Sequence, residues 1–374
     1  MEIELFEVKT KADLRKFIYL PKKIHKNHKN WLPSLYSDDW TLFDPKKNRA
    51  FNYCDTILAL AKKDDKVVGR VMGIINKKYN EIHNENNARF VFMECFDDKE
   101  VFHALIEFIE KWAKSKGAVK LIGPFGFSDK DPQGFLVEGF DESTVMVTNC
   151  SLPYMAEYIE KESFTQLLDL VQYHVAIPNE LPDFYKKVLE RLHRNGYKLH
   201  EFTHIKDVKP FIIPVFKLTN EAFSKIYGYV PYDEKEMKDF ANRYLAILDP
   251  RFIKLITNKE KEVIAYIIGM PSISEGIRKS KGRLFPFGFI YILRSMKTAK
   301  ELDLFLGAIK SEYRNVGLDS LLASAMLKSA HEAKLEVIDS HVILEQNTKM
   351  RAELERFNGK IYKRYRIFQK DILK

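Results

Sequence analysis

The sequence has little of what disulfide-linked, metal-binding or membrane-spanning proteins require. Its three cysteines, Cys54, Cys95 and Cys150, are an odd number at wide spacing and include no CxxC pair. They fit neither a disulfide framework nor a zinc site, and such sparse cysteines are typical of a reducing compartment. We therefore expect a cytoplasmic protein without metal ligands.

Long apolar runs are missing as well. The longest, such as Leu284–Leu293 and Leu304–Ile309, are far shorter than the roughly 20 residues that a membrane-spanning helix needs. Met1–Thr10 alternates charged and apolar residues and lacks a signal-peptide pattern. No transmembrane segment is predicted, and peripheral contact with a membrane stays open.

Several catalytic signatures are also absent. The sequence contains no HExxH, no GxSxG and no Gly-Lys-Ser/Thr phosphate loop. His25 and His28 stand among four lysines, and we interpret this stretch as a solvated basic segment.

The residues that are abundant indicate a folded chain of two domains. Hydrophobic residues make up 45% and aromatic residues 13% of the 374 positions, which excludes a disordered protein. At roughly 100–200 residues per domain, this length favours two domains, each with its own core.

Basic residues outnumber acidic ones by 61 to 52, and most of the surplus lies at the C-terminal end. From Asn347 to Lys374 there are nine basic and three acidic residues. Such an end attracts nucleic acid, an acidic membrane surface or cofactor phosphates, unless it is simply a solvated face. No nucleic-acid recognition motif accompanies it, so nucleic acid is not expected and cofactor phosphates are preferred.

Two blocks of sequence recur at a nearly constant interval, which indicates an internal duplication. Ile57–Gly73 resembles Ile253–Gly269 at an offset of 196 residues, and each reads as a β-hairpin. Met155–Val175 resembles Met350–Phe368 at an offset of 195 residues, and each reads as a helix, a turn and a strand.

We therefore predict two related domains, residues 1–195 and 196–374. Their boundary falls near Ile177–Thr203, where Phe184–Asn195 reads as an amphipathic helix that ends at Gly196. The alternation of helices and strands predicts an α/β fold with mixed sheets in both domains.

The segment Arg314–Asp319 has the character of a phosphate-binding loop. It follows Asp303–Ile309, an almost continuously apolar run that we expect to be a buried strand, and it precedes a helix with Leu321 and Leu322 on its apolar face. The first N–H groups of a helix lack partners inside the helix, and Gly317 lets a phosphate approach them closely.

The order of elements around this loop resembles the GNAT superfamily of acyl-CoA N-acyltransferases. The pyrophosphate loop of that family reads Arg/Gln-x-x-Gly-x-Gly/Ala, and Arg314 and Gly317 stand at its first two defined positions. The next strand, Val337–Leu344, is followed by Asn347 and a helix to Phe357, as in the family. The resemblance covers about Pro214–Ile372 and extends more weakly to the first half.

The resemblance implies two tandem GNAT-like domains with acetyl-CoA or another acyl-CoA as co-substrate. It assigns the acyl-CoA contacts to Gly307, Ala308, Ile309, Arg314, Asn315, Val316, Gly317, Leu318 and Asn347. In the first half, the expected strand Arg89–Phe96 runs into an acidic stretch without such a loop. We expect that half to be degenerate and to shape the cleft.

Two positions depart from the family pattern. Asp319 places a carboxylate where the family has Gly or Ala, and it would repel a phosphate unless it is turned away. Leu354 stands where the family has its usual general acid, a tyrosine, so the departing thiolate would need another donor or leave unassisted.

Candidates for the general base are Glu345, His341 and Glu94. For each a structural role is the alternative, since a histidine on a strand is commonly hydrogen-bonded and Glu345 can cap the next helix. Backbone N–H groups near Gly307–Ile309 would stabilise the oxyanion. The aromatic loop Gly123–Phe140 is either a wall of the cleft or a structural loop.

The function predicted from these features is transfer of an acyl group, taken to be acetyl, from acyl-CoA to an amine. The acceptor would be a small-molecule, peptide or lipid amine. A non-catalytic ligand-binding or interaction module on the same fold is the alternative, favoured by Asp319 and Leu354.

Overall fold

A computed structural model describes residues 2–178, 190, 196–245 and 247–373 of the chain. The expected domain boundary at residue 195, and most of the helix expected over Phe184–Asn195, lie outside the described residues.

The first half begins with five strands of one continuous sheet. They are β1 (Ile3–Glu7), β2 (Cys54–Lys63), β3 (Lys66–Asn76), β4 (Asn87–Cys95) and β5 (Lys120–Gly123). Neighbouring strands are antiparallel except β4 and β5, which are parallel. The helices are α1 (Lys11–Tyr19), α2 (Pro21–Ile24), α3 (Tyr36–Leu42), α4 (Lys77–His83), α5 (Lys99–Ser115) and α6 (Pro153–Lys161).

The second half repeats this layout. Its strands are β8 (Lys198–Glu201), β9 (Ile253–Thr257), β10 (Val263–Pro271), β11 (Glu301–Ile309) and β12 (Val337–Leu344), and only β11 and β12 are parallel among them. Its helices are α8 (Ile205–Val208), α9 (Ile212–Phe223), α10 (Glu234–Tyr244), α11 (Ser274–Ser280), α12 (Gly288–Thr298), α13 (Leu318–Glu332) and α14 (Thr348–Arg356).

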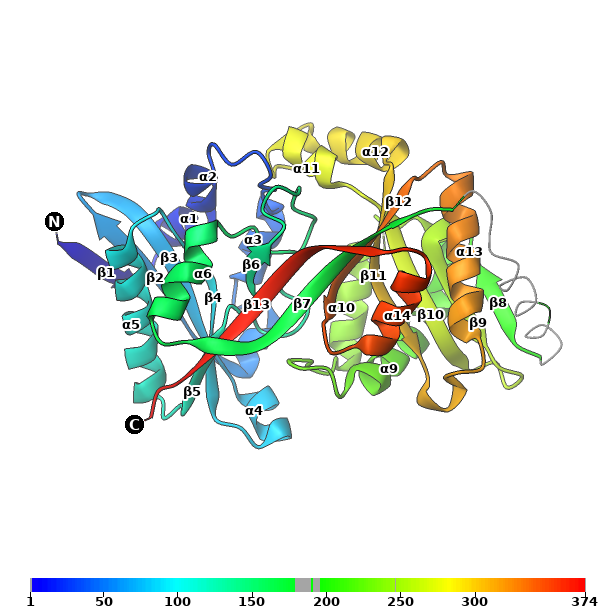
Figure 1. The fold of residues 1–374 in the computed structure, drawn as a ribbon, viewed down its shortest axis with the longest axis horizontal. Helices are drawn as coiled ribbons and strands as arrows, with labels where there is room; N and C mark the ends of the chain where they lie inside the picture. The colour runs from blue at the N-terminus through cyan, green and yellow to red at the C-terminus, as the bar shows by residue number, and fades with distance from the viewer. Residues whose placement is uncertain (1, 179–189, 191–195, 246, 374) are drawn as a thin grey trace.

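The halves exchange their last long strands. β7 (Thr165–Ala176), from the first half, pairs with β12 of the second half, whereas the C-terminal β13 (Lys360–Asp371) pairs with β5 of the first. β7 and β13 also pair with each other along most of their length, and β6 (Phe135–Glu138) pairs with β13. The C-terminus therefore lies beside β5 and α5 (Figure 1).

The expected repeat is present in the structure. Ile57–Gly73 lies in the β2–β3 hairpin and Ile253–Gly269 in the β9–β10 hairpin, with an antiparallel register in each. The two expected helix–strand units are α6 with β7 and α14 with β13. The predicted mixed α/β fold is confirmed.

Each half has a core between its sheet and one long amphipathic helix. In the first half the apolar face of α5, with Phe102, Leu105 and Ile109, packs on β2, β3 and β4. In the second half Met326 and Ala330 of α13 pack on β11, β12 and the exchanged β7. The β7 strand is thus part of the second core.

The basic C-terminal strand is held by acidic residues of the first half. Arg366 makes a bidentate contact with the buried Asp169 of β7 at 2.8 and 2.9 Å. Arg364 contacts Glu138 at 3.1 Å, and Lys370 contacts Glu110 of α5 at 2.5 Å. Arg364, Arg366 and Lys370 therefore join the halves, so the charge of these three residues has partners within the protein.

The aromatic loop Gly123–Phe140 is pinned into the protein by its own side chains. Phe125, Phe127 and Phe135 are buried. Phe125 packs against Gly228 of the second half, where an added Cβ would lie 1.9 Å from the ring. Lys130 donates to the carbonyl of Val230 at 2.8 Å. These contacts support the structural interpretation of the loop.

No helix among the described residues has both the length and the apolar character to cross a membrane.

Because the exchanged strands are held together by Arg366, we expect its loss to lower the free energy of unfolding more than the loss of an exposed arginine that also pairs with a carboxylate. Arg366→Ala leaves the carboxylate of Asp169, 4% exposed, with only the more distant Arg364 at 3.6 Å. We expect a loss of about 2–3 kcal/mol in the free energy of unfolding, measured by urea denaturation. Arg356→Ala is the control, because the Arg356–Glu353 pair is local to α14 and more exposed; it should cost within about 0.5 kcal/mol. Equal losses would contradict the role of the exchanged strand.

Candidate active site

The parallel strands β11 and β12 separate after three rungs. Glu301, Leu302 and Asp303 pair with β12, and Asp303 lies directly opposite Asp339. Beyond this rung, the described part of β11 pairs only with β10, while β12 continues along β7. The two strands diverge and leave a V-shaped opening with the Asp303–Asp339 rung at its apex.

The backbone of β11 has a free edge along this opening. Lys310 donates its N–H to the carbonyl of Ile264 on β10 at 2.8 Å. Because residues alternate along an antiparallel strand, Gly307 and Ile309 direct their N–H groups away from β10 and into the opening. Gly307 is exposed, and a Cβ there would meet nothing closer than 3.5 Å. The side chain of Ala308 is buried in a cluster with Tyr266, its partner on β10.

The loop after β11 presents an uncapped helix end. Gly317 precedes α13 with φ of 95°, and no side chain caps the first N–H groups of the helix. Arg314 and Asn315 are exposed beside it, and Arg314 donates to the carbonyl of Ile309 at 3.4 Å. Leu318 is buried in the core, so only its backbone faces this end. The arrangement suits an anion such as a pyrophosphate.

The corresponding place in the first half is filled by the protein itself. The side chain of Asp98 caps α5 through the N–H groups of Glu100 and Val101 at 3.1 and 3.3 Å. At the strand edge the two halves are alike, because Tyr154 donates to the carbonyl of Cys95 at 2.8 Å just as Arg314 donates to the carbonyl of Ile309. Of the two helix starts, the one in the second half is therefore left open to an anion.

The two departures from the family pattern have structural explanations. Asp319 lies beside Glu353 of α14, and burial together with the Asp319 carboxylate raises the pKa of Glu353. Leu354 is buried in the core against the sheet. Asn347, the expected helix start, accepts from the N–H of Met350 at 3.3 Å and caps α14.

The apex of the opening holds a buried acidic cluster that the sequence did not reveal to us. Leu302 and Ile338 face α13, so the alternating Asp303 and Asp339 point to the opposite face of the sheet. Both aspartates are 0% exposed. Neither carboxylate oxygen of Asp303 forms a regular hydrogen bond to a described residue, although Ser272 and Glu301 lie near.

The two aspartates differ in their electrostatics. Burial, with the neighbouring carboxylates of Asp339 and Glu301, raises the pKa of Asp303 well above its ordinary value. Burial would also raise the pKa of Asp339, but hydrogen bonds from His174, Gln172 and Tyr362 outweigh it and hold that pKa low. Asp303 is thus suited to take up a proton, and Asp339 to stay charged.

The three proposed bases have separate surroundings. His341 lies next to the apex, where its N–H donates to Asp339 at 2.7 Å and its Nε2 donates to the carbonyl of Met146 at 3.0 Å. Burial lowers the pKa of His341, which favours a neutral ring. Glu345 instead pairs with Arg364 at 2.5 Å.

Glu94 belongs to a network of the first half. It contacts Arg70 at 2.6 Å and His25 at 3.1 Å. Burial would raise the pKa of Glu94, but the positive charge of Arg70 and the hydrogen bond from His25 lower it to about 2. A carboxylate of such low pKa is a poor proton acceptor at neutral pH.

Asp303 and Asp339 could have been found from one signal. Each is a carboxylate inside a strand that is otherwise largely apolar, DLFLGAI and VIDSHVIL. Such residues are rarely fully buried without a partner.

Comparison with solved structures identifies the fold, although no family model matches the sequence. A tandem GNAT protein from the clavulanic acid biosynthesis pathway aligns over 100% of this chain and 99% of its own, with a TM-score of 0.58 and 13% identity. A GCN5-related N-acetyltransferase from Sphaerobacter thermophilus aligns over 100% and 96%, with a TM-score of 0.53 and 11% identity. The chain therefore has the tandem GNAT fold.

Two curated relatives match almost the whole chain. Protein YghO of Escherichia coli is 27% identical over 377 residues, which covers 97% of this chain and 94% of the relative. A bacterial ceramide synthase of Caulobacter vibrioides is 25% identical over 379 residues, which covers 99% and 97%.

The contrast between the two helix starts predicts where coenzyme A binds. Arg314→Glu places a negative charge beside the uncapped end of α13 and should raise the Kd for coenzyme A at least about 10-fold by calorimetry. Lys99→Glu makes the same change at the start of α5 and should leave the Kd unchanged. An effect of Lys99→Glu alone would place the site in the first half.

Proposed function

We propose that this protein is an N-acyltransferase that moves an acyl group from acyl-CoA to an amine at the β11–β12 opening. The observation that supports it best is the order of groups along that opening. The uncapped start of α13, the free N–H groups of Gly307 and Ile309, and the buried carboxylate of Asp303 follow one another along a single strand and loop.

Each group has a chemical role in this reaction. The start of α13 and Arg314 hold the phosphates of the co-substrate. The N–H groups of Gly307 and Ile309 stabilise the negative charge that develops on the thioester oxygen when the amine attacks. Asp303 accepts the proton that the amine loses. The C–N bond forms as the C–S bond breaks, and coenzyme A leaves as a thiolate that takes its proton from solvent.

The acceptor that we propose is a long-chain amine at a membrane surface. The loop between α11 and α12, together with α12, exposes six of the eleven large apolar side chains that are exposed among the described residues. They are Phe285, Phe287, Phe289, Ile290, Tyr291 and Leu293. Exposed basic residues flank them, namely Lys279, Lys281, Arg283, Arg294 and Lys297. An apolar tip with a basic rim fits an anionic lipid surface.

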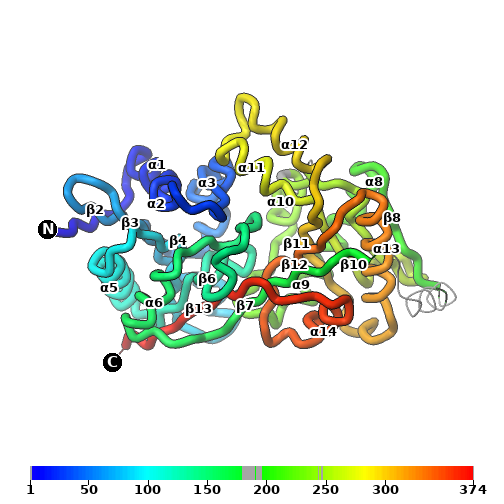
Figure 2. Tube along the Cα trace, turned by 45° about the horizontal axis from the view of Figure 1, so that its top comes forward, coloured from blue at the N-terminus to red at the C-terminus, as the bar shows by residue number. Residues whose placement is uncertain are grey.

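The hairpin that carries this apolar tip packs on the strand that holds Asp303. The α11–α12 hairpin projects from the body of the protein (Figure 2). Its inner residues Ile277 and Ile292 pack with Phe305 of β11, two residues beyond Asp303. Ser295 of α12 donates to the carbonyl of Ser272, whose side chain lies near Asp303. A lipid amine that reaches along this hairpin would therefore meet the strand that carries the proposed base.

The ceramide synthase relative supports the same class of substrate. A ceramide is the N-acyl derivative of a long-chain amino alcohol, so its synthesis joins an acyl group to a lipid amine. The three cysteines of this chain are free, which agrees with a reaction at the cytoplasmic face of a membrane.

A non-catalytic module on the same fold is the second candidate. The observation in its favour is Leu354, an apolar core residue at the position of the family's usual acid. Such a module would bind coenzyme A but would not turn over.

Asp303 provides the test of catalysis. With acetyl-CoA, palmitoyl-CoA and a long-chain amino alcohol as substrates, Asp303→Asn should lower kcat at least about 100-fold, because it removes the proton acceptor. It should not lower the thermal stability at neutral pH. The folded pKa of Asp303 is raised, so its ionisation costs stability as pH rises through that pKa, and the amide avoids this cost.

The pH dependence gives a further readout of the same variant. The base acts when deprotonated, so kcat/KM of the wild type should rise with pH through a midpoint above 3.8, the ordinary pKa of an aspartate. Unchanged turnover in Asp303→Asn would exclude the proposed base. Coenzyme A binding without turnover of any amine by the wild type would favour the module.

The apolar tip predicts binding to lipid vesicles. Phe285→Ser with Leu293→Ser should weaken sedimentation with vesicles of phosphatidylglycerol and phosphatidylcholine at least about 10-fold, because less apolar surface is buried. Ile82→Ser, at an exposed residue of α4, is the matched control and should bind as the wild type does. Equal binding by both variants would show that the tip is not the docking surface.

A further inference from the structure

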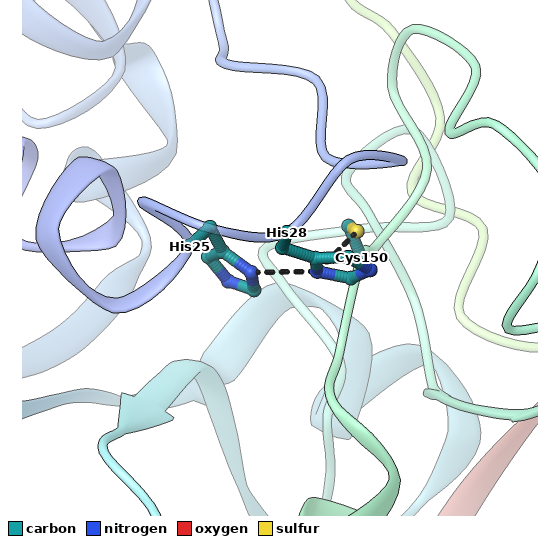
Figure 3. Close-up of side chains that lie close together, drawn as sticks. All are labelled: His25, His28 and Cys150. Atoms are coloured by element: carbon teal, nitrogen blue, oxygen red, sulfur yellow. Dashed lines mark hydrogen bonds between the residues drawn. The ribbon is translucent and has the colours of Figure 1, made fainter.

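Two histidines and a cysteine from distant segments converge in the first half (Figure 3). His25 and His28 come from the segment after α2, and Cys150 comes from the stretch before α6. Nδ1 of His25 lies 3.0 Å from Nδ1 of His28, which lies 3.7 Å from Sγ of Cys150. One possible ligand atom from each residue lies within 4.8 Å of the other two.

This cluster is an interior feature. His25 is 3% exposed, and its ring stacks on Trp31 at 5.4 Å between centroids. His28 and Cys150 are half-buried. The interpretation of this stretch as a solvated basic segment is therefore wrong for His25. The reason is tertiary, since the segment folds against Glu94 of β4.

Hydrogen bonds among the three residues do not satisfy all of them together, although Thr144 also lies within reach of the Cys150 thiol. Nε2 of His25 lies 3.1 Å from the carboxylate of Glu94. In a neutral His25 ring the proton is therefore on Nε2, which donates to Glu94, and Nδ1 keeps its lone pair. Nδ1 of His28 can then donate one hydrogen to His25, and it has no lone pair left to accept from the thiol of Cys150. One nitrogen therefore faces two partners but can bind only one of them.

A metal ion would satisfy all three atoms at once. For tetrahedral zinc with Zn–N of about 2.0–2.1 Å and Zn–S of about 2.3 Å, neighbouring ligand atoms are about 3.3 Å (N to N) and about 3.6 Å (N to S) apart. The distances in the protein are 3.0 and 3.7 Å. A shift of a few tenths of an ångström would bring these two pairs to coordination geometry. The ligand atoms of His25 and Cys150, which lie within 4.8 Å of each other, would approach by up to about 1.2 Å.

The surroundings of His25 match those of a metal-bound histidine. Ligand histidines commonly donate their second ring N–H to a carboxylate, which fixes the ring and its tautomer. Glu94 occupies that position and is itself held by Arg70 at 2.6 Å.

We propose that His25, His28 and Cys150 form a binding site for a zinc ion, with a fourth position for water or another ligand. The imidazole and thiolate donors suit Zn²⁺ and exclude the oxygen-seeking Mg²⁺ and Ca²⁺. The spacing of 25, 28 and 150 follows no sequence motif, which is why the sequence predicted no metal.

The ion would fasten the segment after α2 to a loop that serves the proposed active site. The loop that ends at Cys150 accepts hydrogen bonds from two residues of the second half. His341, next to the apex, donates to Met146, and Lys363 of β13 donates to Ser143. The zinc site would thus hold this loop against the second half.

Metal binding to the full, tag-free chain tests the proposal. After removal of metal with a chelator, the chain should bind one equivalent of Co²⁺ and show thiolate-to-cobalt charge-transfer absorption, and Zn²⁺ should displace the cobalt. Zn²⁺ should also raise the melting temperature. These readouts do not depend on acyl transfer, so they stand or fall separately from the proposed function.

Variants identify the ligands. Cys150→Ser should abolish the charge-transfer band, and His28→Gln should weaken Zn²⁺ binding at least about 100-fold, because each removes a donor. Glu94→Gln should weaken it about 10-fold or more through the orientation of His25. Cys54→Ala and His331→Gln, which remove a thiol and an imidazole elsewhere, should bind as the wild type does.

Two results would overturn the zinc site. The first is a folded wild type, shown by circular dichroism, that binds neither Co²⁺ nor Zn²⁺ at micromolar concentrations. The second is an unchanged cobalt spectrum in Cys150→Ser, which would place any bound ion elsewhere.

Discussion

The pairing of β7 with β13 is the interaction on which the rest of the structure depends. Each of these 12-residue strands leaves its own half and completes the sheet of the other, so neither half has a full sheet by itself. The exchange carries buried charge with it, as in the contact of Arg366 with Asp169. Because the strands are long and pair along most of their length, the two halves are fixed relative to each other, and groups from both can build one site.

Within this shared frame the two halves have become different. Both retain the parallel pair that separates after three rungs, the feature that opens a sheet for a ligand. In the first half the side chain of Asp98 caps the helix start, whereas in the second half Gly317 leaves that start without a side-chain cap. In the proposed reaction the second half therefore holds the co-substrate, whereas the first half supplies loops and the histidine–cysteine cluster.

The proposed active site contains a buried carboxylate that lowers the stability of the folded protein and that an amine substrate would stabilise. A buried aspartate without a regular hydrogen bond, beside two more carboxylates, destabilises the folded chain unless it binds a proton or a cation. An amine substrate brings both a positive charge and a proton to that position. The α11–α12 hairpin packs on the same face of the sheet, and the exposure of its apolar tip is explained if the tip rests on lipid.

The sequence by itself determined the local elements and the duplication, because hairpins, helices and the loop at Arg314–Gly317 are written in contiguous patterns of apolar, charged and glycine residues. It could not determine which strands exchange, since β7 and β13 read alike whether they complete their own sheet or the other one. It also could not place Asp303 opposite Asp339, or His25 beside Cys150, because those contacts join residues far apart in the chain. Only the tertiary structure decided them, through strand register and the burial of charge.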